Sequence, residues 1–293
     1  MAYTLSASTD QVFSLEQYID YVSTKVDVND EACVLESAWA LKALANNRTF
    51  IAEALNQELA SWQSFQANNR YTPQTMMLGR GRGFFVRANI WEPPDEAVRS
   101  EEHNRLFAYK VPHDHNFSFM TAGYLGSGYE TSIYEYDRDA TDGRPGTHAG
   151  LRFLEHTALP QGKVMMYRAC KDVHIQEHSS EFSISLNLML QPPTLLDKDQ
   201  YYFNIEEDRL DDFVPNSSTG RTMLCRIARH VGDDRTSELL DQIGQYHSAR
   251  RVRALALESL AELRPEMRAY VMRVASADCD PLVRTIARQL DSK

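Results

Sequence analysis

The sequence has no long apolar run and no excess of positive charge. Its 293 residues include 31 Lys and Arg against 41 Asp and Glu, which gives a formal net charge of −10. So acidic a chain has little electrostatic attraction for nucleic acid or an anionic membrane, and we expect neither as a partner. No apolar stretch approaches the length of a membrane span, and the first residues lack the basic and apolar regions of a signal peptide. We therefore expect a cytoplasmic protein.

Cysteine is also scarce. The four cysteines (33, 170, 225 and 279) are far apart, and none belongs to a Cys-x-x-Cys pair. This spacing argues against a disulfide framework or a zinc knuckle. We expect each cysteine to behave as a small, buried apolar residue.

The first part of the chain is predicted to be helical. Apolar residues recur at helical spacing through residues 14–66 and predict three helices, the third with a cap at Thr49. Residues 67–83 are polar and glycine-rich, which predicts a loop. We expect residues 1–83 to form a helical segment that packs on the next domain.

The period changes after residue 83. Short runs of β-branched and aromatic residues, separated by turns, indicate an all-β sandwich or barrel. The candidate strands are 84–91, 106–111, 117–124, 131–136, 151–159, 163–168, 173–176 and 182–190. Residues 92–105 are predicted to form an exposed loop, and 137–149 a polar turn region.

From about residue 216 the pattern is helical again, and it repeats. The stretch 221–228 recurs 31 residues later at 252–259 and again at 283–290. A helix pair recurring at this period indicates a helical solenoid, and residues 278–284 resemble HEAT-like repeats. A plain helical bundle is the alternative. We expect residues 216–293 to bind a protein partner, to self-associate, or to bind a carrier or peptide that presents the substrate.

A metal site is predicted from two histidines one residue apart. On a strand His113 and His115 point to the same face, so both imidazoles can reach one ion. A third ligand must come from a distant strand, and His174, at the head of a strand-like stretch, is our choice. His178 is the second choice for this ligand. Glu130 is a carboxylate alternative, and the loop histidines at 148 and 156 are further candidates.

These residues carry a family resemblance over about residues 84–193. The chain resembles the cupin barrel of the cysteine dioxygenase type in His113-Asp114-His115, in residues 126–134, in Val173-His174, in residues 179–188 and in Pro192-Pro193. The resemblance implies a cupin-type jelly-roll barrel, which we place at 84–200. With the N-terminal helices and the C-terminal helical repeat module predicted from the apolar spacing, we expect an α+β protein. The resemblance also implies one ferrous iron held by His113, His115 and His174, with Arg87 holding a substrate carboxylate.

The chain departs from that family near the end of the barrel. Family members that oxidise cysteine carry a Ser-x-His-x-Tyr arrangement there, whereas this chain has Ser185-Leu186-Asn187-Leu188-Met189. Met120 stands where the family has the cysteine that crosslinks to that tyrosine. We expect a mononuclear non-heme iron oxygenase acting on a small amino-acid-like or thiol-like molecule, with Arg87, Glu130 and Tyr124 as catalytic candidates. The alternatives are a non-catalytic metal or ligand sensor that uses the helical repeats, and a non-oxidative enzyme that uses zinc, nickel or manganese.

Overall fold

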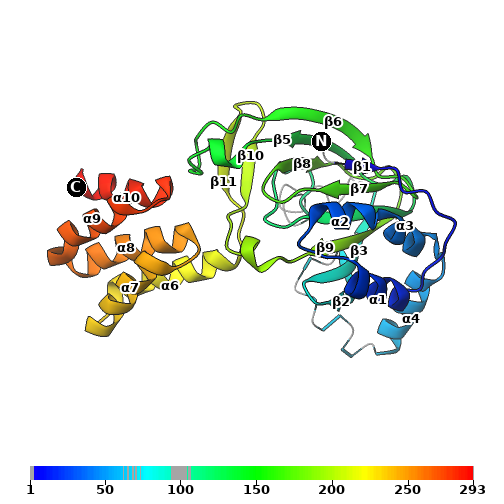
Figure 1. The fold of residues 1–293 in the computed structure, drawn as a ribbon, viewed down its shortest axis with the longest axis horizontal. Coiled ribbons are helices and arrows are strands. Elements are labelled where there is room, and N and C mark those ends of the chain that lie inside the picture. Colours follow the sequence, from blue (N-terminus) through cyan, green and yellow to red (C-terminus); the bar gives the residue numbers. More distant parts are fainter. Residues whose placement is uncertain are drawn as a thin grey trace. The chain divides into compact units, whose positions relative to one another are not determined.

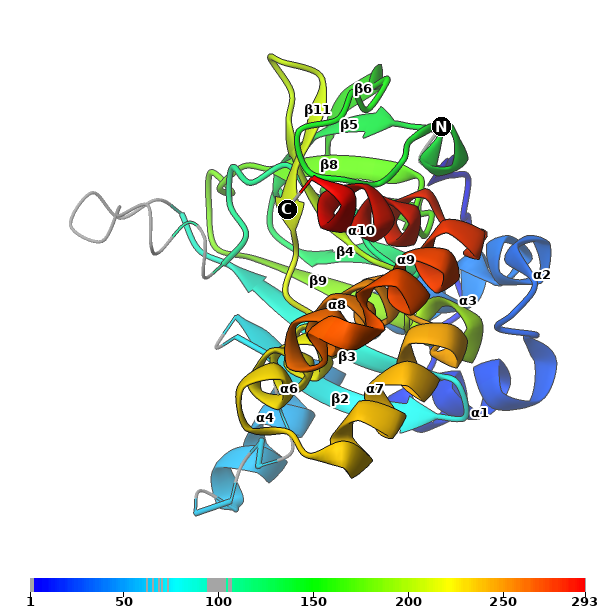
Figure 2. The same cartoon turned by 90° about the vertical axis from the view of Figure 1, so that its left-hand side faces the viewer.

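The chain divides into two compact units, each built from two segments. A computed structural model describes residues 3–61, 63–64, 66–67, 69, 71–72, 74–93, 104 and 107–292. One unit comprises residues 1–136 and 151–195, and the second comprises 137–150 and 196–293. The fold is a mixture of helices and antiparallel sheets (Figures 1 and 2).

Four helices lie within residues 15–60 of the first unit, where the apolar spacing predicts three. They are α1 (Leu15–Lys25), α2 (Glu31–Glu36), α3 (Ala38–Asn46) and α4 (Phe50–Ala60). The second predicted helix is thus split in two. Ser14 and Gln17 form a capping box that satisfies free amides at the start of α1. Thr49 is the N-cap residue of α4, but its side chain makes no capping hydrogen bond.

The larger sheet has six strands in the order β1-β7-β4-β9-β3-β2. Its strands are β1 (Tyr3–Leu5), β2 (Thr75–Gly81), β3 (Phe84–Trp91), β4 (Phe119–Leu125), β7 (Val164–Tyr167) and β9 (Ser183–Leu190). The prediction of a loop over 67–83 is wrong for β2. This strand forms because its backbone pairs along β3, and Gly79 lets it approach α1, where an added Cβ would lie 2.4 Å from Ile19 Cδ1.

The two faces of this sheet have different neighbours. One face, with alternate residues of β3, β4, β7 and β9, packs against α1–α4 in a single apolar cluster. The helices of this cluster are blue in Figure 1. Residues of the opposite face share a second cluster with residues of β5, so a second sheet covers it. Side chains between the two sheets are therefore shielded from water on both sides.

The second sheet has three strands in the order β6-β5-β8, namely β5 (Glu130–Glu135), β6 (Arg152–Ala158) and β8 (Asp172–Gln176). Among the described residues no continuous strand pairing joins the two sheets into a closed barrel. The pairing outside the named ladders consists of single bridges, such as that between Gly123 and Gln161. The strand expected at 106–111 is absent from its described part, 107–111. Ala108 and Lys110 have left-handed φ angles of 56° and 57°, which interrupt an extended strand. Most of the loop predicted at 92–105 lies outside the described residues.

The second unit joins a β-hairpin to five helices. The hairpin is β10 (Tyr201–Asn204) and β11 (Arg209–Phe213), which the sequence patterns did not predict. The helices are α6 (Ser217–Val231), α7 (Asp234–Tyr246), α8 (Arg250–Leu263), α9 (Arg268–Ala277) and α10 (Pro281–Asp291). The three recurring stretches lie on α6, α8 and α10, and α8 contacts both of the others. The HEAT-like character of this array stays a prediction.

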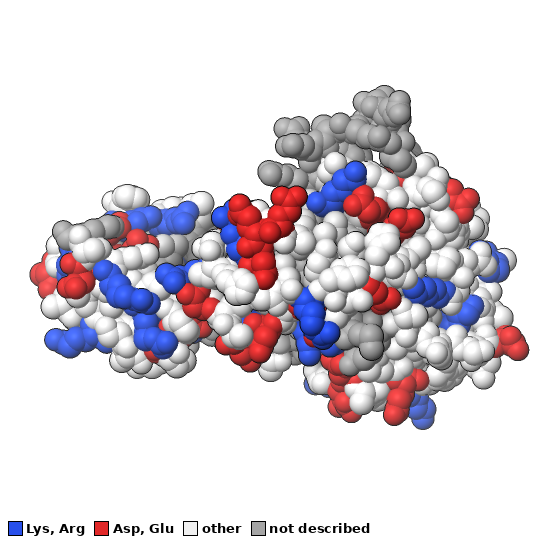
Figure 3. Space-filling model, turned by 90° about the horizontal axis from the view of Figure 1, so that it is seen from above, with Lys and Arg blue, Asp and Glu red and all other residues white. Residues whose placement is uncertain are grey.

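On the face shown in Figure 3, acidic and basic side chains are interspersed over the molecule. The basic cluster at Arg250, Arg251 and Arg253 is neutralised internally, because these side chains pair with Asp199, Asp278 and Asp280.

Within the described part of the chain, none of the helices is both long enough and apolar enough to cross a membrane.

Candidate metal centre

The backbone places His113 directly opposite His174. Each residue donates its amide to the carbonyl of the other, at 3.2 and 3.0 Å, so the His113 segment extends the edge of β8 by one antiparallel bridge. The His115 carbonyl accepts a hydrogen bond from the Cys170 amide at 2.6 Å, in the turn before β8. Two segments some 60 residues apart in sequence are therefore held in register at this point.

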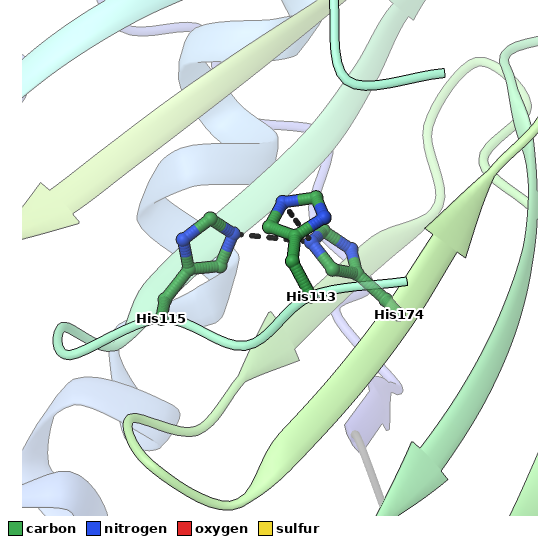
Figure 4. Close-up of side chains that lie close together, drawn as sticks. All are labelled: His113, His115 and His174. Atoms are coloured by element: carbon green, nitrogen blue, oxygen red, sulfur yellow. Dashed lines mark hydrogen bonds between the residues drawn. The ribbon is translucent and has the colours of Figure 1, made fainter. Parts of the chain in front are cut away.

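The three predicted histidines form one group (Figure 4). The Nε2 atom of His174 lies 3.0 Å from Nε2 of His115 and 3.2 Å from Nε2 of His113. All three ligand atoms lie within 4.8 Å of one another. His113 and His174 are buried, while His115 is half-buried and packs against the rings of Phe117 and Phe119. The sequence thus identified side chains that the fold brings together.

Each imidazole of this group is held neutral. Burial lowers the pKa of all three, and it does so strongly for His115 and His174. Electrostatic coupling to the titration of His113 and His174, and the positive charge of Arg87, lower the pKa of His115 further. His113 Nδ1 donates a hydrogen bond to the Val111 carbonyl at 2.8 Å, which leaves the lone pair of His113 on Nε2 and facing the group. Neutral nitrogens with inward lone pairs are what a metal ion requires.

The donor set fits one divalent transition metal. A metal–imidazole bond is about 2.1 Å long, so nitrogens 3.0 and 3.2 Å apart can share one ion at angles of roughly 90–100°. The widest pair would have to close to about 4.2 Å or less, which is a shift of a few tenths of an ångström. The outer nitrogens of His115 and His174 are buried and have no hydrogen-bond partner among the described residues. The group therefore has one ligand with a fixed outer hydrogen bond and two without.

Arg87 lies on β3, on the face of the large sheet that the second sheet covers. Its guanidinium stacks on the Tyr71 ring at 4.8 Å, and its Nε atom is buried. Among the described residues it forms no hydrogen bond and no ion pair. Its charge acts on His115 and on Tyr129, which places it beside the histidine group. An unpaired guanidinium at this place can receive an anionic group of a ligand.

The other two catalytic candidates lie elsewhere. Glu130 is exposed, and its carboxylate is 3.4 Å from His156 Nε2. Tyr124 is buried under the helices, where its ring packs against Phe50 at 5.4 Å and against the Arg48 guanidinium at 4.6 Å. The structure does not bring either of them to the three histidines.

The alternative histidine ligands are also outside the group. His178 stacks on Tyr109 with ring centroids 3.8 Å apart. His148 and His156 have largely exposed side chains that face Asp208 and Glu130. Of the histidines that the structure describes, only those at 113, 115 and 174 gather in a group that could hold a metal.

The sequence patterns did not identify Thr121, Asn187 or Tyr167 as part of the site. Asn187 and Thr121 are buried on the same inner face as Arg87. The Tyr129 and Tyr167 hydroxyls are 3.4 Å apart, and the Tyr167 ring is 4.8 Å from the His174 ring. A strand register would have aligned Arg87 with Asn187, but register between distant strands is not encoded locally.

Comparison with known proteins gives no family assignment. No family model matches the sequence, and no curated protein matches it either. Solved structures with partial similarity include a DMSP lyase, with 12% identity over 44% of this chain and 52% of the other and a TM-score of 0.27. Hydroquinone 1,2-dioxygenase from Sphingomonas sp. TTNP3 matches with 9% identity over 43% of this chain and 70% of the other, TM-score 0.28.

A third similar structure is salicylate 1,2-dioxygenase from Pseudoaminobacter salicylatoxidans. It has 9% identity over 48% of this chain and 32% of the other, with a TM-score of 0.26. The matched region is about half of the lyase and about a third of this dioxygenase. Similarities this partial assign no activity to the chain.

Proposed function

We propose that the chain is a mononuclear non-heme iron oxygenase of the cupin type, acting on a small amino-acid-like or thiol-like carboxylate. The observation that carries this proposal is the convergence of three neutral, shielded imidazoles, at His113, His115 and His174, on one point. Three protein ligands hold a metal while leaving coordination positions open for substrate. The choice of iron follows the resemblance of the histidine segments to the cysteine dioxygenase type of cupin.

In this proposal, different residues of the chain hold the metal, bind the substrate and exclude water. The three imidazoles hold the ion, and the bond from His113 to the Val111 carbonyl fixes one ring. Arg87 binds and orients the substrate carboxylate. Phe119 and Tyr167 stack with ring centroids 4.6 Å apart beside His174, and they exclude water from that side. Bound ferrous iron would supply the electrons that activate dioxygen next to the bound substrate.

Metal content is the first test of this function. Elemental analysis of anaerobically purified protein should find near-stoichiometric iron in the wild type, lost in both His113→Ala and His174→Ala. His178→Ala and Glu130→Gln are matched controls, because each alters a ligand candidate that lies outside the group, and both should retain iron. Oxygen uptake with a panel of amino acids and small thiols should follow iron content across the variants.

The outcomes separate the alternatives that share this site. Zinc, nickel or manganese at the three histidines would indicate a non-oxidative enzyme. Iron without oxygen uptake by any member of the panel would favour a sensor. A wild type that holds no metal, or metal that both alanine variants retain, would contradict the site itself.

A further inference from the structure

One register row of the large sheet carries three polar side chains toward the second sheet. Arg87 on β3 is paired with Asn187 on β9, and Asn187 is paired with Thr121 on β4. The residues before and after each of them belong to the apolar cluster under the helices. Because side chains alternate along a strand, the three polar residues share the opposite, inner face.

The Asn187 amide is buried there with an unused donor. Asn187 is 3% exposed, and its Nδ2 atom has no hydrogen-bond partner among the described residues. Buried amides are normally paired, so a buried donor left free indicates a place that a ligand fills. The contrast with Asn89 on the neighbouring β3 is direct, because the Asn89 carbonyl oxygen accepts a hydrogen bond from Thr75 Oγ1 at 3.1 Å.

The charge beside Asn187 is also uncompensated. Arg87 forms no ion pair with any described residue, and the groups that act on its charge are the phenols of Tyr71 and Tyr129. Burial raises the pKa of both phenols, so both are neutral at physiological pH. Arg168, a buried arginine of the same unit, has both Asp172 and Glu135 as partners. No described carboxylate offsets the charge of Arg87, so the carboxylate of a ligand can take this place.

We propose that Asn187 determines substrate specificity by donating a hydrogen bond from Nδ2 to one oxygen of the carboxylate whose charge Arg87 neutralises. The ligand class is a short monocarboxylate. A carboxylate offers two acceptors and a charge, which matches one amide donor next to one guanidinium. This inference deepens the proposed function and rests on it for the reaction, but the binding that it predicts does not require the metal.

Binding of propionate and of its neutral isostere propionamide to the full-length chain tests the inference. Calorimetry should show the wild type binding propionate at least tenfold more tightly than propionamide. Asn187→Leu removes the donor at nearly constant volume and should weaken propionate binding about tenfold, as expected for a hydrogen bond to a charged group. Asn187→Asp gives Arg87 a permanent partner and repels the ligand, so propionate binding should fall at least a hundredfold while the melting temperature holds or rises.

Asn89→Asp is the matched control. It makes the same chemical change on the same face, at an amide that Thr75 already engages, and it should leave propionate affinity within about threefold of wild type. A wild type that does not distinguish propionate from propionamide would overturn the inference. So would an Asn187→Asp variant that binds propionate like the wild type.

Metal analysis on the same samples keeps this inference apart from the proposed function. Propionate binding that depends on Asn187, in a protein without metal, would leave the carboxylate site standing and remove the oxygenase. Iron held by the three histidines, with propionate binding indifferent to Asn187, would do the reverse.

Discussion

At the scale of single residues, the first unit contains two arginines, one buried and one half-buried, that differ in their partners. Arg168 is 7% exposed and forms ion pairs with Asp172 and Glu135, so its charge is neutralised within the fold. Arg87 has no such partner among the described residues. A paired buried charge is expensive to disturb but has nothing left to offer a ligand. The unpaired one is the better candidate for binding.

The Arg168 network predicts a loss of stability at acid pH. Burial alone would raise the pKa of Glu135, but hydrogen bonds from Arg152 and Arg168 lower it to about 2. Because the folded pKa lies below the unfolded value, the stabilisation is complete above about pH 5 and is lost as the pH falls toward 2. In Glu135→Gln the free energy of unfolding should vary less over this range, by roughly 1–3 kcal/mol.

Urea unfolding at several pH values measures this difference. Glu177→Gln is the control, since Glu177 lies 3.7 Å from Lys110 in an exposed pair worth at most about 1 kcal/mol. Parallel curves for wild type and Glu135→Gln between pH 5 and 2 would show that the network does not stabilise the fold through this carboxylate.

At the scale of elements, the turn between β4 and β5 is fixed by close backbone contact. Gly128 has φ = +75°, and a Cβ built on it would lie 1.8 Å from the Leu159 carbonyl oxygen. Gly146 also has a positive φ, +88°, but an added Cβ would meet nothing within 4 Å. Substituting alanine at Gly146 would introduce backbone strain alone, whereas at Gly128 it would introduce strain and a steric clash. Comparing the two losses of stability therefore isolates the contribution of the clash.

We therefore predict unequal effects of the same substitution. Gly146→Ala should cost about 1 kcal/mol, because only left-handed backbone strain opposes the new methyl group. Gly128→Ala should cost at least about 3 kcal/mol, because strand backbone must also move. Chemical denaturation of both variants measures the difference, and equal costs would mean that the β4–β5 turn yields easily.

Local patterns predicted most elements but not the pairings between them. Apolar spacing indicated α1, α4 and most of the strands, and the His-x-His pair was placed correctly beside His174. Tyr124 was wrongly chosen, because side chains alternate along β4 and Tyr124 shares the helix-covered face with Met120 and Ala122, opposite the face of the site. β2 and the β10–β11 hairpin were missed, since both depend on partners rather than on a strong local signal.

At the scale of the whole molecule, the second unit is stabilised by contacts between its two chain segments. The Tyr201 hydroxyl donates to the Gly143 carbonyl at 3.0 Å, and Arg138 donates to the Asp199 carbonyl at 2.8 Å. Arg250 and Arg251 on α8 both bind the buried Asp199 carboxylate, at 2.8 and 2.6 Å. The segment 137–150, the hairpin and α8 thus share one polar network.

Arg250→Met should destabilise the second unit selectively. It removes one of the two cations on Asp199, whose side chain is 2% exposed, and should cost about 2–4 kcal/mol. All three tryptophans (39, 62 and 91) belong to the first unit, so tryptophan fluorescence reports that unit alone. We expect urea unfolding followed by far-ultraviolet circular dichroism to shift to lower urea, while the fluorescence transition and the metal content stay unchanged.

Arg235→Gln serves as the control, because Arg235 pairs with Glu238 in an exposed contact that contributes at most about 1 kcal/mol. A fluorescence transition that shifts together with the dichroism would mean that the two units unfold as one.

The divided construction of the second unit also sets an order of events during synthesis. Arg138 leaves the ribosome 61 residues before Asp199, its partner, and Gly143 precedes Arg250 by 107. The intervening residues 151–195 supply four strands of the first unit. These strands are synthesised before the residues with which the segment 137–150 pairs. The segment 137–150 therefore leaves the ribosome well before the residues of the second unit with which it pairs, and we expect a chaperone or protease to engage this segment first in the nascent chain.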